Sequence, residues 1–275
     1  MTLFALVSPG GSPGATTSAL ALALTWPRPV VLAECDPAGG DILAGLFAGH
    51  LPGPPGLLGL ALEAGRGAGR LRADLAAHLA PLDMGGNRWF LAGIRDPRQA
   101  PGLARCWPAI ATELAGHSAD VIADCGRLDA GEGQPASILA LASVVVFVMR
   151  ASVRQVAAAG PRIEMVSAVA GGTGRLRLLL VGERGSGARE VGRTSGIPVL
   201  GSLPADARTA ALLSDGQGHR SGLHRSPLIR AAQVAGQAMI ELAASTGAPG
   251  RAGVAPPDAT WAANQVGVLP ARSEP

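Results

Sequence analysis

The 275-residue chain has no lysine and no tyrosine, and all 23 of its basic residues are arginine. Aromatic residues make up only 3% of the sequence, so a core would have to be built from leucine, valine, isoleucine and alanine. Hydrophobic residues nevertheless reach 48%, which excludes an intrinsically disordered chain. The length is enough for one large α/β domain or two small ones.

Cysteine is scarce as well, with only Cys35, Cys106 and Cys125 present. A sparse, odd set without a CxxC pair excludes a disulfide framework and a cysteine zinc site, and it favours a reducing compartment. The five histidines have no metal-ligand spacing either. Cys35 and Cys125 each stand beside an aspartate. We interpret both as small apolar residues at strand ends, with a redox role as the alternative.

Long hydrophobic runs are missing. The longest nearly apolar stretch, residues 136–149, is shorter than the ~20 residues that a membrane span requires. It is predicted to be the end of a helix followed by a buried strand. The first residues carry no basic segment, and their apolar run is too short for a signal peptide. We therefore expect a soluble, cytoplasmic protein without membrane insertion.

Charge is uneven along the chain, although the net value is only +3. Residues 1–149 hold 9 arginines and 12 acidic residues, whereas residues 150–275 hold 14 arginines and 8 acidic residues. The basic second half favours either a solvated arginine surface or contact with nucleic acid or an acidic partner. Because no helix-turn-helix pattern or aromatic-interleaved basic patch is present, nonspecific DNA binding is the secondary hypothesis.

Short, continuously apolar runs alternate with helical patterns along the chain. Strands buried on both faces have this continuous pattern, as in a parallel sheet with helices on each side. The predicted strands are residues 3–7, 30–34, 88–92, 120–124, 144–148, 176–181 and 198–203. The predicted helices are residues 15–26, 71–80, 98–117, 152–169, 186–195, 205–214 and 226–245. This order predicts a doubly wound α/β fold, with a mostly parallel sheet and helices on both faces.

Two segments rich in glycine and proline lack a helical or strand period. Residues 49–69 are predicted to be a loop with a short helix, and residues 247–275 a disordered tail. Residues 1–246 are assigned to one domain. In a doubly wound sheet, ligands bind at the C-terminal ends of the strands.

Three stretches would meet at that edge of the sheet. The first, "SPGGSPGATT" (residues 8–17), joins an apolar strand to a helix. Its glycines let backbone N–H groups turn toward an anion, and the helix N-terminus adds the positive end of its dipole. Thr16 stands where a P-loop hydroxyl binds Mg²⁺. The plain alternative is a Gly/Pro-rich turn capped by serine or threonine.

The second and third stretches carry carboxylates. Asp36 lies in "ECDPAGGD" (residues 34–41), directly after the second strand. Asp124 ends the apolar strand of "DVIADCGRLDAG" (residues 120–131), from where a carboxylate can reach a Mg²⁺ shell. The alternatives are Asp36 as a cap in an Asp-Pro turn and Asp124 as an ordinary strand-ending residue. Three such features in order, each at a strand end, favour a site for phosphate and magnesium.

These residues resemble the ParA/MinD family of P-loop ATPases, whose deviant Walker A loop is K-G-G-x-G-K-[ST]-[ST]. The sequence "GGSPGATT" takes its place in register and matches it at Gly11, Gly14, Thr16 and Thr17. "ECDP" resembles the family's D-x-D-P, "DVIADCG" its strand before switch II, and residues 176–216 its late strands. The resemblance covers residues 1–245.

The resemblance implies ATP or ADP with Mg²⁺ as the cofactor of a nucleotide-binding domain. The nucleotide would be held by Gly10, Gly11, Ser12, Pro13, Gly14, Ala15, Thr16, Thr17, Pro204 and Asp206. The Mg²⁺ ion would be held by Thr16, Asp36 and Asp124. Asp36 would also be the catalytic residue, because the matching family aspartate positions the attacking water.

Both of the family's loop lysines are absent. The signature lysine falls on Gly10 and the P-loop lysine on Ala15, while Glu183 stands where the family has an asparagine on the adenine side. Fast ATP hydrolysis is not expected, since a donor aimed at developing charge contributes about 10²–10³ in rate. Arg127 and Arg150 are the candidates to replace the missing positive charge.

The implied function is a nucleotide-responsive homodimeric switch with weak or absent ATPase activity. Such a switch would position a cargo, or assemble a partition, secretion or pilus machine, together with protein partners. The alternative is a pseudo-ATPase scaffold that binds protein partners without nucleotide. The C-terminal sequence offers no basic amphipathic helix, so no lipid binding is expected.

Overall fold

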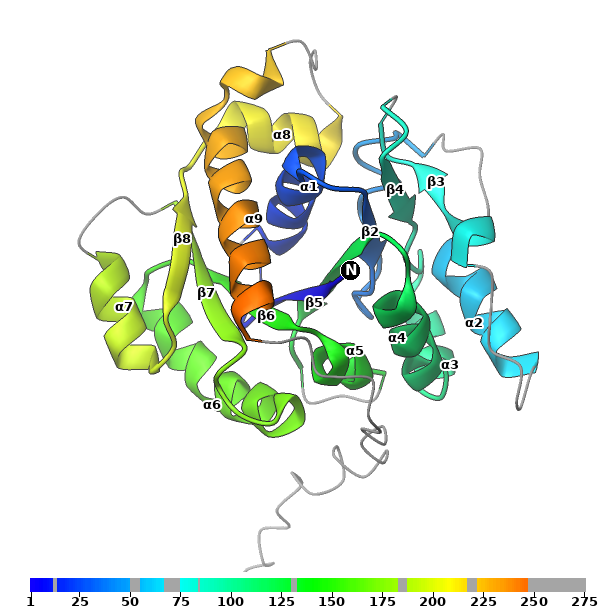
Figure 1. The fold of residues 1–275 in the computed structure, drawn as a ribbon, viewed down its shortest axis with the longest axis horizontal. Coiled ribbons are helices and arrows are strands. Elements are labelled where there is room, and N and C mark those ends of the chain that lie inside the picture. The colour runs from blue at the N-terminus through cyan, green and yellow to red at the C-terminus, as the bar shows by residue number, and fades with distance from the viewer. Residues whose placement is uncertain are drawn as a thin grey trace, which may run out of the picture.

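The computed structural model describes residues 1–11, 14–49, 55–66, 75–83, 85–129, 133–182, 187–216 and 222–246. The strands are β1 (Leu3–Ser8), β2 (Val30–Glu34), β3 (Ala80–Pro81), β4 (Arg88–Leu91), β5 (Asp120–Arg127), β6 (Val144–Met149), β7 (Leu176–Val181) and β8 (Val199–Leu203). They form one sheet in the order β3-β4-β2-β5-β1-β6-β7-β8 (Figure 1). Every neighbouring pair is parallel except β3 and β4.

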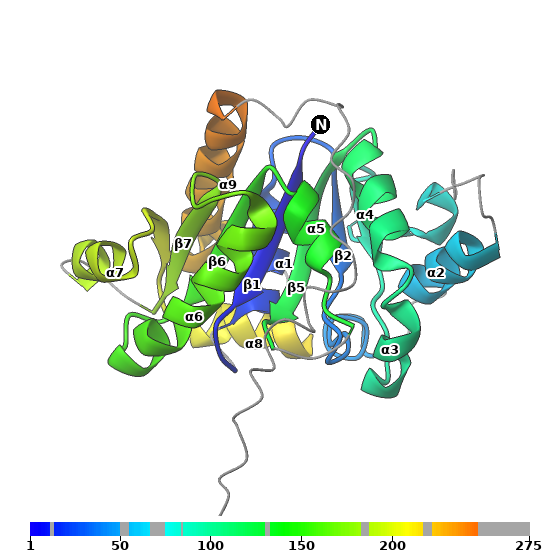
Figure 2. The same ribbon diagram turned by 90° about the horizontal axis from the view of Figure 1, so that it is seen from below.

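Helices cover both faces of this sheet. They are α1 (Ala15–Thr25), α2 (Gly56–Arg66), α3 (Ala100–Leu103), α4 (Trp107–Gly116), α5 (Ala136–Leu141), α6 (Val153–Ala170), α7 (Gly187–Ser195), α8 (Ala207–Asp215) and α9 (Pro227–Ser245). Helices α1, α8 and α9 pack together on one face, and α4, α5 and α6 lie on the other (Figure 2). The fold is the doubly wound, mostly parallel α/β arrangement that the sequence predicts.

The central strand β1 shows why the apolar runs are continuous. Leu3, Ala5 and Val7 point into the core on the side of α4, α5 and α6. Phe4 and Leu6 point into a second core under α1 and α9. Since both faces of a doubly wound sheet are buried, alternate residues of one strand serve two separate cores.

One predicted helix is broken into pieces. Residues 98–117 were expected to form a single helix, but the segment consists of a 3-10 turn at Pro97–Gln99, the short α3 and then α4. Pro101 and Pro108 lie in the first turns of α3 and α4. Proline fits the first turn of a helix and disrupts the interior, so each proline begins a new helix.

The sequence interpretation of residues 49–80 was also wrong in part. The prediction of a helix over 71–80 fails where the structure describes it, because Leu75–His78 forms a 3-10 turn and Ala80 begins the edge strand β3. Pro81 is tolerated there, since an edge strand can do without one N–H. Upstream, the short helix predicted within residues 49–69 is α2, which buries Leu57 and Leu60.

Two further predictions concern the C-terminal tail and membrane-spanning helices. The predicted tail, 247–275, lies outside the described residues. Within the part of the chain that the structure describes, no helix is both long enough and apolar enough to cross a bilayer.

Candidate functional site

The helix α1 begins directly after the loop that follows β1. Gly14 is the N-cap of α1 with φ of 90°, a left-handed conformation that suits glycine, and among the described residues no side chain caps the helix there. Ser8 Oγ donates to the Gly10 carbonyl at 2.8 Å, which tightens the start of the loop. The uncapped N–H groups and the helix dipole favour an anion at this point. Ser12 and Pro13 lie outside the described residues.

The three residues that open α1 face different surroundings. Ala15, at the position of the P-loop lysine, is buried in the core under α1. Thr16 donates a hydrogen bond to the Asp124 carboxylate. Thr17 lines a cavity. Thr16 therefore faces the carboxylates, where a cation would bind, and Thr17 faces the cavity, where phosphate would bind.

That cavity has a volume of about 500 Å³ and lies between the N-terminus of α1 and the segment after β8. Its walls are formed by Gly14, Thr17, Ser18, Arg150, Val181, Gly182, Pro204, Ala205, Asp206, Ala207, Ala210 and Leu228. The helix end and Arg150 make it suited to an anion, whereas valine, proline, alanine and leucine offer apolar contact. The volume is within the range of small-molecule sites, about 300–1,000 Å³. Sequence analysis had assigned Pro204 and Asp206 to the same ligand as the loop, and the structure brings them to one cavity with Gly14 and Thr17.

Asp206 serves mainly to hold this wall in place. As N-cap of α8, its carboxylate accepts hydrogen bonds from the Thr209 N–H at 3.1 Å, Thr209 Oγ1 at 2.8 Å and Ser226 Oγ at 2.7 Å. Burial raises the pKa of Asp206, but the hydrogen bonds from Ser226 and Thr209 outweigh it, so the net pKa is below the ordinary value. Asp206 thus links the start of α8 to the start of α9 beside the cavity.

Asp124 and Asp36 lie together on the other side of Thr16. Asp124 is 1% exposed and accepts the Gly126 N–H at 3.1 Å. Burial raises its pKa, although the hydrogen bonds from Thr16 and Gly126 oppose the rise. Burial likewise raises the pKa of Asp36 to about 6, against a hydrogen bond from the Ala38 N–H, and the Asp124 charge adds to the rise.

The closeness of Asp36 to β5 depends on a glycine. Gly126 has φ of +63°, and a Cβ built on it would lie only 1.8 Å from Asp36 Oδ2. The Asp36 carboxylate therefore packs directly against the backbone of Gly126, two residues after Asp124. Three of the residues predicted from sequence, Thr16, Asp36 and Asp124, thus meet at the C-terminal edge of the sheet.

Glu34 is a buried carboxylate that the sequence analysis did not place in the site. It is aligned with Asp124 across β2 and β5, and it is 2% exposed. Its two oxygens accept the Ile42 N–H at 2.8 Å and the Gly93 N–H at 3.1 Å. Burial raises its pKa to about 7 against these two hydrogen bonds, and the Asp124 charge contributes. Glu34 anchors the loop after β2, which carries Asp36.

The donor set fits magnesium only with help from a ligand. Among the described residues, no three or more histidine, cysteine, aspartate or glutamate side chains are arranged to hold a metal ion. The Thr16 hydroxyl and the nearby Asp124 and Asp36 carboxylates would give a partial shell. Mg²⁺ commonly binds in this way, through one or two carboxylates with phosphate oxygens and water.

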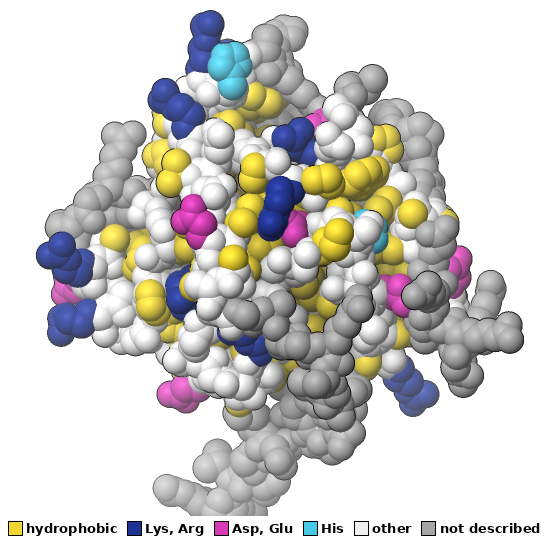
Figure 3. Space-filling view, in the orientation of Figure 1, with side chains coloured by type: hydrophobic (Ala, Val, Ile, Leu, Met, Phe, Trp, Pro, Cys, Tyr) yellow, Lys and Arg dark blue, Asp and Glu magenta, His cyan; other side chains and the backbone are white. Residues whose placement is uncertain are grey.

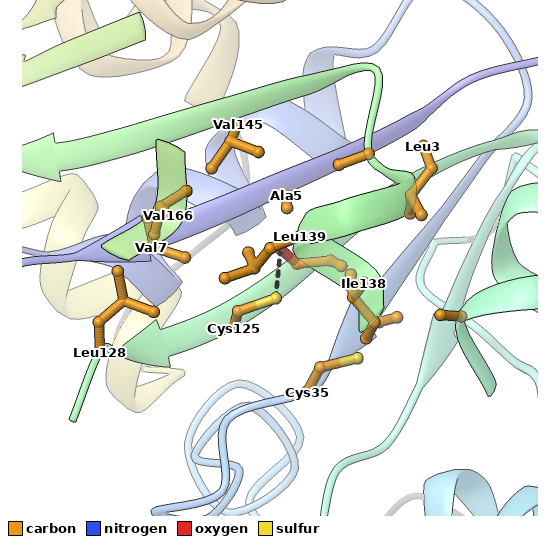
Figure 4. Packing of buried hydrophobic residues seen from close by; sticks show 14 of the residues in the cluster. Leu3, Ala5, Val7, Cys35, Cys125, Leu128, Ile138, Leu139, Val145 and Val166 are labelled. Carbon is orange, nitrogen blue, oxygen red and sulfur yellow. Dashed lines mark hydrogen bonds between the residues drawn. The ribbon is translucent and has the colours of Figure 1, made fainter. Parts of the chain in front are cut away.

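Cys35 and Cys125 lie in the core beside this site. Both are fully buried among apolar side chains between the sheet and α5, as Figure 4 shows. Burial raises the pKa of each thiol well above its ordinary value, and the nearby carboxylates add to the rise. A thiol held protonated is unreactive, which supports the interpretation of both as small apolar residues.

The two arginine candidates differ sharply. Arg127 Nη2 is 2.5 Å from Asp129 Oδ2, so its charge is already paired. Arg150 follows β6, is exposed, and lines the cavity beside Gly14. It has no ion-pair partner among the residues that the structure describes.

Sequence analysis missed Gln155. This residue of α6 is 6% exposed, and its Oε1 has no hydrogen-bond partner among the described residues. A Cβ built on Gly10 would lie 3.5 Å from Gln155 Nε2, so the amide faces the loop. No motif marked it, because a glutamine in an amphipathic helix reads as an ordinary surface residue.

The face drawn in Figure 3 gives no support to DNA binding. Arginine side chains of the described residues are spread over it with acidic side chains among them, and they form no continuous stripe. A nonspecific DNA site would be expected to gather positive charge on one surface.

The fold is similar to those of solved MinD and ParA family proteins. MinD of Pyrococcus horikoshii OT3, solved with Mg-ADP, is 17% identical, and the match covers 90% of this chain and 99% of that one at a TM-score of 0.65. A ParA family ATPase of Chlorobium tepidum TLS is 16% identical over 86% of this chain and 98% of its own, at 0.66. Apo McdA of Cyanothece is 16% identical over 87% and 100%, also at 0.66.

No model of a known protein family matches the sequence, and no curated protein matches it significantly. The structural matches nevertheless establish the fold. The chain has the fold of the MinD and ParA ATPases, as the resemblance of the loop and strand ends predicted.

Proposed function

We propose that this chain binds a nucleoside di- or triphosphate with Mg²⁺ and acts as a nucleotide-responsive switch of the ParA/MinD type. The observation that carries the proposal is the cavity of about 500 Å³ at the uncapped N-terminus of α1, with Thr17 and Arg150 in its wall. Solved proteins of this fold support it: one MinD was solved with Mg-ADP, and a putative plasmid partition protein of Borrelia burgdorferi B31 with AMPPNP.

In this proposal the phosphates lie at Gly14 and Thr17, where backbone N–H groups and the helix dipole stabilise negative charge. The nucleoside lies toward Pro204 and Leu228, in the more apolar part of the cavity. Thr16, Asp124 and Asp36 would hold Mg²⁺, which would neutralise part of the phosphate charge.

Hydrolysis would be slow in this chain. Asp36, with its pKa at about 6, is mostly ionised at neutral pH and is placed to orient water as the catalytic residue. However, the loop offers no lysine to stabilise charge on the transferred phosphate, because that position is the buried Ala15. Loss of one such donor costs about 10²–10³ in rate.

The cellular role we propose is positioning or partition of a cargo by a dimer that forms with nucleotide and binds a protein partner. One solved relative of this fold is a MinC:MinD complex, in which the ATPase is bound to a second protein. The alternative is a pseudo-ATPase scaffold. The buried Ala15 and the unneutralised carboxylates Glu34, Asp36 and Asp124 favour that alternative, since negative charge opposes phosphate binding.

Calorimetric titration of the purified chain with ADP and ATP, with Mg²⁺ and with EDTA, separates the two functions. The switch predicts saturable binding that weakens without Mg²⁺ and weakens in Asp124→Asn. Asp215→Asn is the matched control, because Asp215 is exposed at the end of α8 and makes the same charge change. No binding of either nucleotide up to about 1 mM would reject the switch in favour of the scaffold.

Dimerisation is tested separately by light scattering during gel filtration. The switch predicts a shift from monomer to dimer with a non-hydrolysable ATP analogue and no shift with ADP. An unchanged mass with both nucleotides, in protein that binds them, would reject the dimeric part of the proposal.

A further inference from the structure

The segment that joins β6 to α6 places one side chain in the cavity wall and a second beside the loop between β1 and α1. Arg150 follows the last residue of β6 and lines the cavity together with Gly14 and Thr17. Gln155, in the first turns of α6, faces Gly10 on the other side of the same loop. Ser152 fixes the turn between them, because its Oγ accepts the Gln155 N–H at 3.3 Å and caps α6.

Neither side chain is fully paired with the described residues. Gln155 is 94% buried, yet its Oε1 accepts no hydrogen bond from the described residues. A buried amide oxygen without a donor costs about 1–3 kcal/mol and needs a donor such as water, whereas the Nε2 of the same amide is the atom that can donate to a phosphate oxygen. Arg150 has no carboxylate within ion-pair distance in the described part of the chain.

No other basic residue is among the described residues of the cavity wall. The chain has no lysine. Arg127, the second candidate, is paired with Asp129 and is not among the residues of the cavity wall. Among the described residues of the cavity wall, Arg150 is therefore the one basic side chain that can supply the charge that the loop does not carry.

We propose that the β6–α6 segment replaces the missing loop lysines as the phosphate-recognition element of this chain. The Arg150 guanidinium binds phosphate oxygens of the nucleotide. Gln155 Nε2, the amide atom nearest Gly10, donates a hydrogen bond to a phosphate oxygen held by the loop. This inference rests on the proposed function, because it assigns the contacts of the same nucleotide site. A guanidinium suits the task, since its fork of N–H donors matches phosphate oxygens.

The first test compares ADP binding, with Mg²⁺, by the wild type and Arg150→Ala. Loss of a charge-assisted hydrogen bond is expected to weaken binding about 10- to 100-fold, and Arg150→Lys to restore part of the loss. Arg150 is exposed, so its truncation leaves the fold intact, which an unchanged thermal midpoint will verify. Arg154→Ala is the matched control. It removes the same charge from an exposed arginine at the start of α6, outside the cavity wall.

The second test uses Gln155→Glu and Gln155→Leu. A carboxylate at this position would repel phosphate, so Gln155→Glu is expected to weaken ADP binding at least about 10-fold, and more than Gln155→Leu does. The excess of the glutamate variant over the leucine variant separates a contact with the anion from a merely structural role. Equal affinities of the two variants would overturn this part of the assignment.

The outcomes separate the inference from the proposed function. If the wild type binds ADP and Arg150→Ala binds it equally well, the inference fails while the proposed function stands. The same holds if Arg127→Ala, rather than Arg150→Ala, loses the affinity. If the wild type binds neither ADP nor ATP, both fail.

Discussion

Asp120 and Asp124 lie four residues apart on β5, and both are almost completely buried. At the start of the strand, Asp120 has a full set of partners. Its carboxylate is 2.6 Å from Arg28 Nη2, and it accepts hydrogen bonds from Trp26 Nε1 at 2.9 Å and the Thr2 N–H at 3.0 Å. A cation and two N–H donors compensate for the water that this carboxylate lost on folding.

Asp124, at the other end, has no cation within ion-pair distance among the described residues. Burial raises its pKa in spite of the hydrogen bonds from Thr16 and the Gly126 N–H, and the Asp41 carboxylate adds to the rise. Asp36 and Glu34 are its neighbours, and the pKa of each is raised as well.

The difference indicates that Asp120 has a structural role and that Asp124 belongs to the candidate site. The pair at Asp120 stabilises the fold, since every polar atom there is matched. The group at Asp124 holds three carboxylates close together with hydrogen bonds but no ion pair among the described residues, and such a stability cost is typical of functional sites. A bound cation would relieve the repulsion, which is why the comparison supports a Mg²⁺ ligand at this end.

The largest effect is expected from removing the matched carboxylate. Asp120→Ala leaves Trp26 Nε1 and the Thr2 N–H without an acceptor and Arg28 without its partner. The expected loss is about 3 kcal/mol in the free energy of unfolding, measured by urea denaturation. The exposed Asp215→Ala should change it by less than about 0.5 kcal/mol. A loss below about 1 kcal/mol for Asp120→Ala would show that its partners do not stabilise the fold.

The next largest effect is expected from a substitution at Gly126, which tests its contact with Asp36. Gly126→Ala would place a methyl group 1.8 Å from the present position of Asp36 Oδ2, at a φ of +63°. Strain and overpacking together are expected to lower the free energy of unfolding by about 2 kcal/mol. Gly116→Ala is the control, because a Cβ there meets nothing within 4 Å. It should be neutral or stabilising by about 0.5 kcal/mol. Equal effects of the two variants would mean that Asp36 does not rest on residue 126.

The raised pKa values predict an unusual pH dependence of stability. Glu34 has an ordinary pKa of 4.5, which is its value in the unfolded chain, and about 7 in the fold; for Asp36 the values are 3.8 and about 6. Between these limits the folded state binds more protons, so stability falls as the pH rises. The contribution is complete below about pH 4 and lost above about pH 7.

The expected result is a free energy of unfolding that is about 1–2 kcal/mol higher at pH 5 than at pH 8. His117, whose pKa is lowered by burial, acts in the opposite direction, so the difference between the wild type and Glu34→Gln isolates the carboxylate. Urea denaturation at four pH values measures it. If Glu34→Gln keeps the full pH dependence of the wild type, the pKa of Glu34 is not raised in the fold.

Local sequence patterns were enough for the fold and for Asp36 and Asp124 at the carboxylate end of the site, but not for Glu34. Continuous apolar runs mark strands buried on both faces, and Asp36 and Asp124 each follow such a run. The patterns could not choose between Arg127 and Arg150, because the choice depends on Asp129 lying next to the first. Gln155 was missed for the same reason. Its importance arises only when α6 packs against the loop at Gly10, and that contact spans more than a hundred residues.

The smallest effect on stability, and the sharpest test of the comparison, comes from making the same substitution at both aspartates. Asp124→Asn keeps an oxygen for the Gly126 N–H and can still bond Thr16, while it removes a charge that its neighbours oppose. The free energy of unfolding should therefore change by less than about 1 kcal/mol. Binding of ADP with Mg²⁺ should weaken at least about 10-fold.

Asp120→Asn should show the reverse, because it loses the ion pair with Arg28 but lies far from the cavity, at the opposite edge of the sheet. It is expected to lower stability by more than Asp124→Asn does and to leave the ADP affinity unchanged. Calorimetry and urea denaturation on the two variants give all four values. If both variants lose stability equally and neither loses ADP affinity, then Asp124 is a second structural carboxylate and has no role in nucleotide binding.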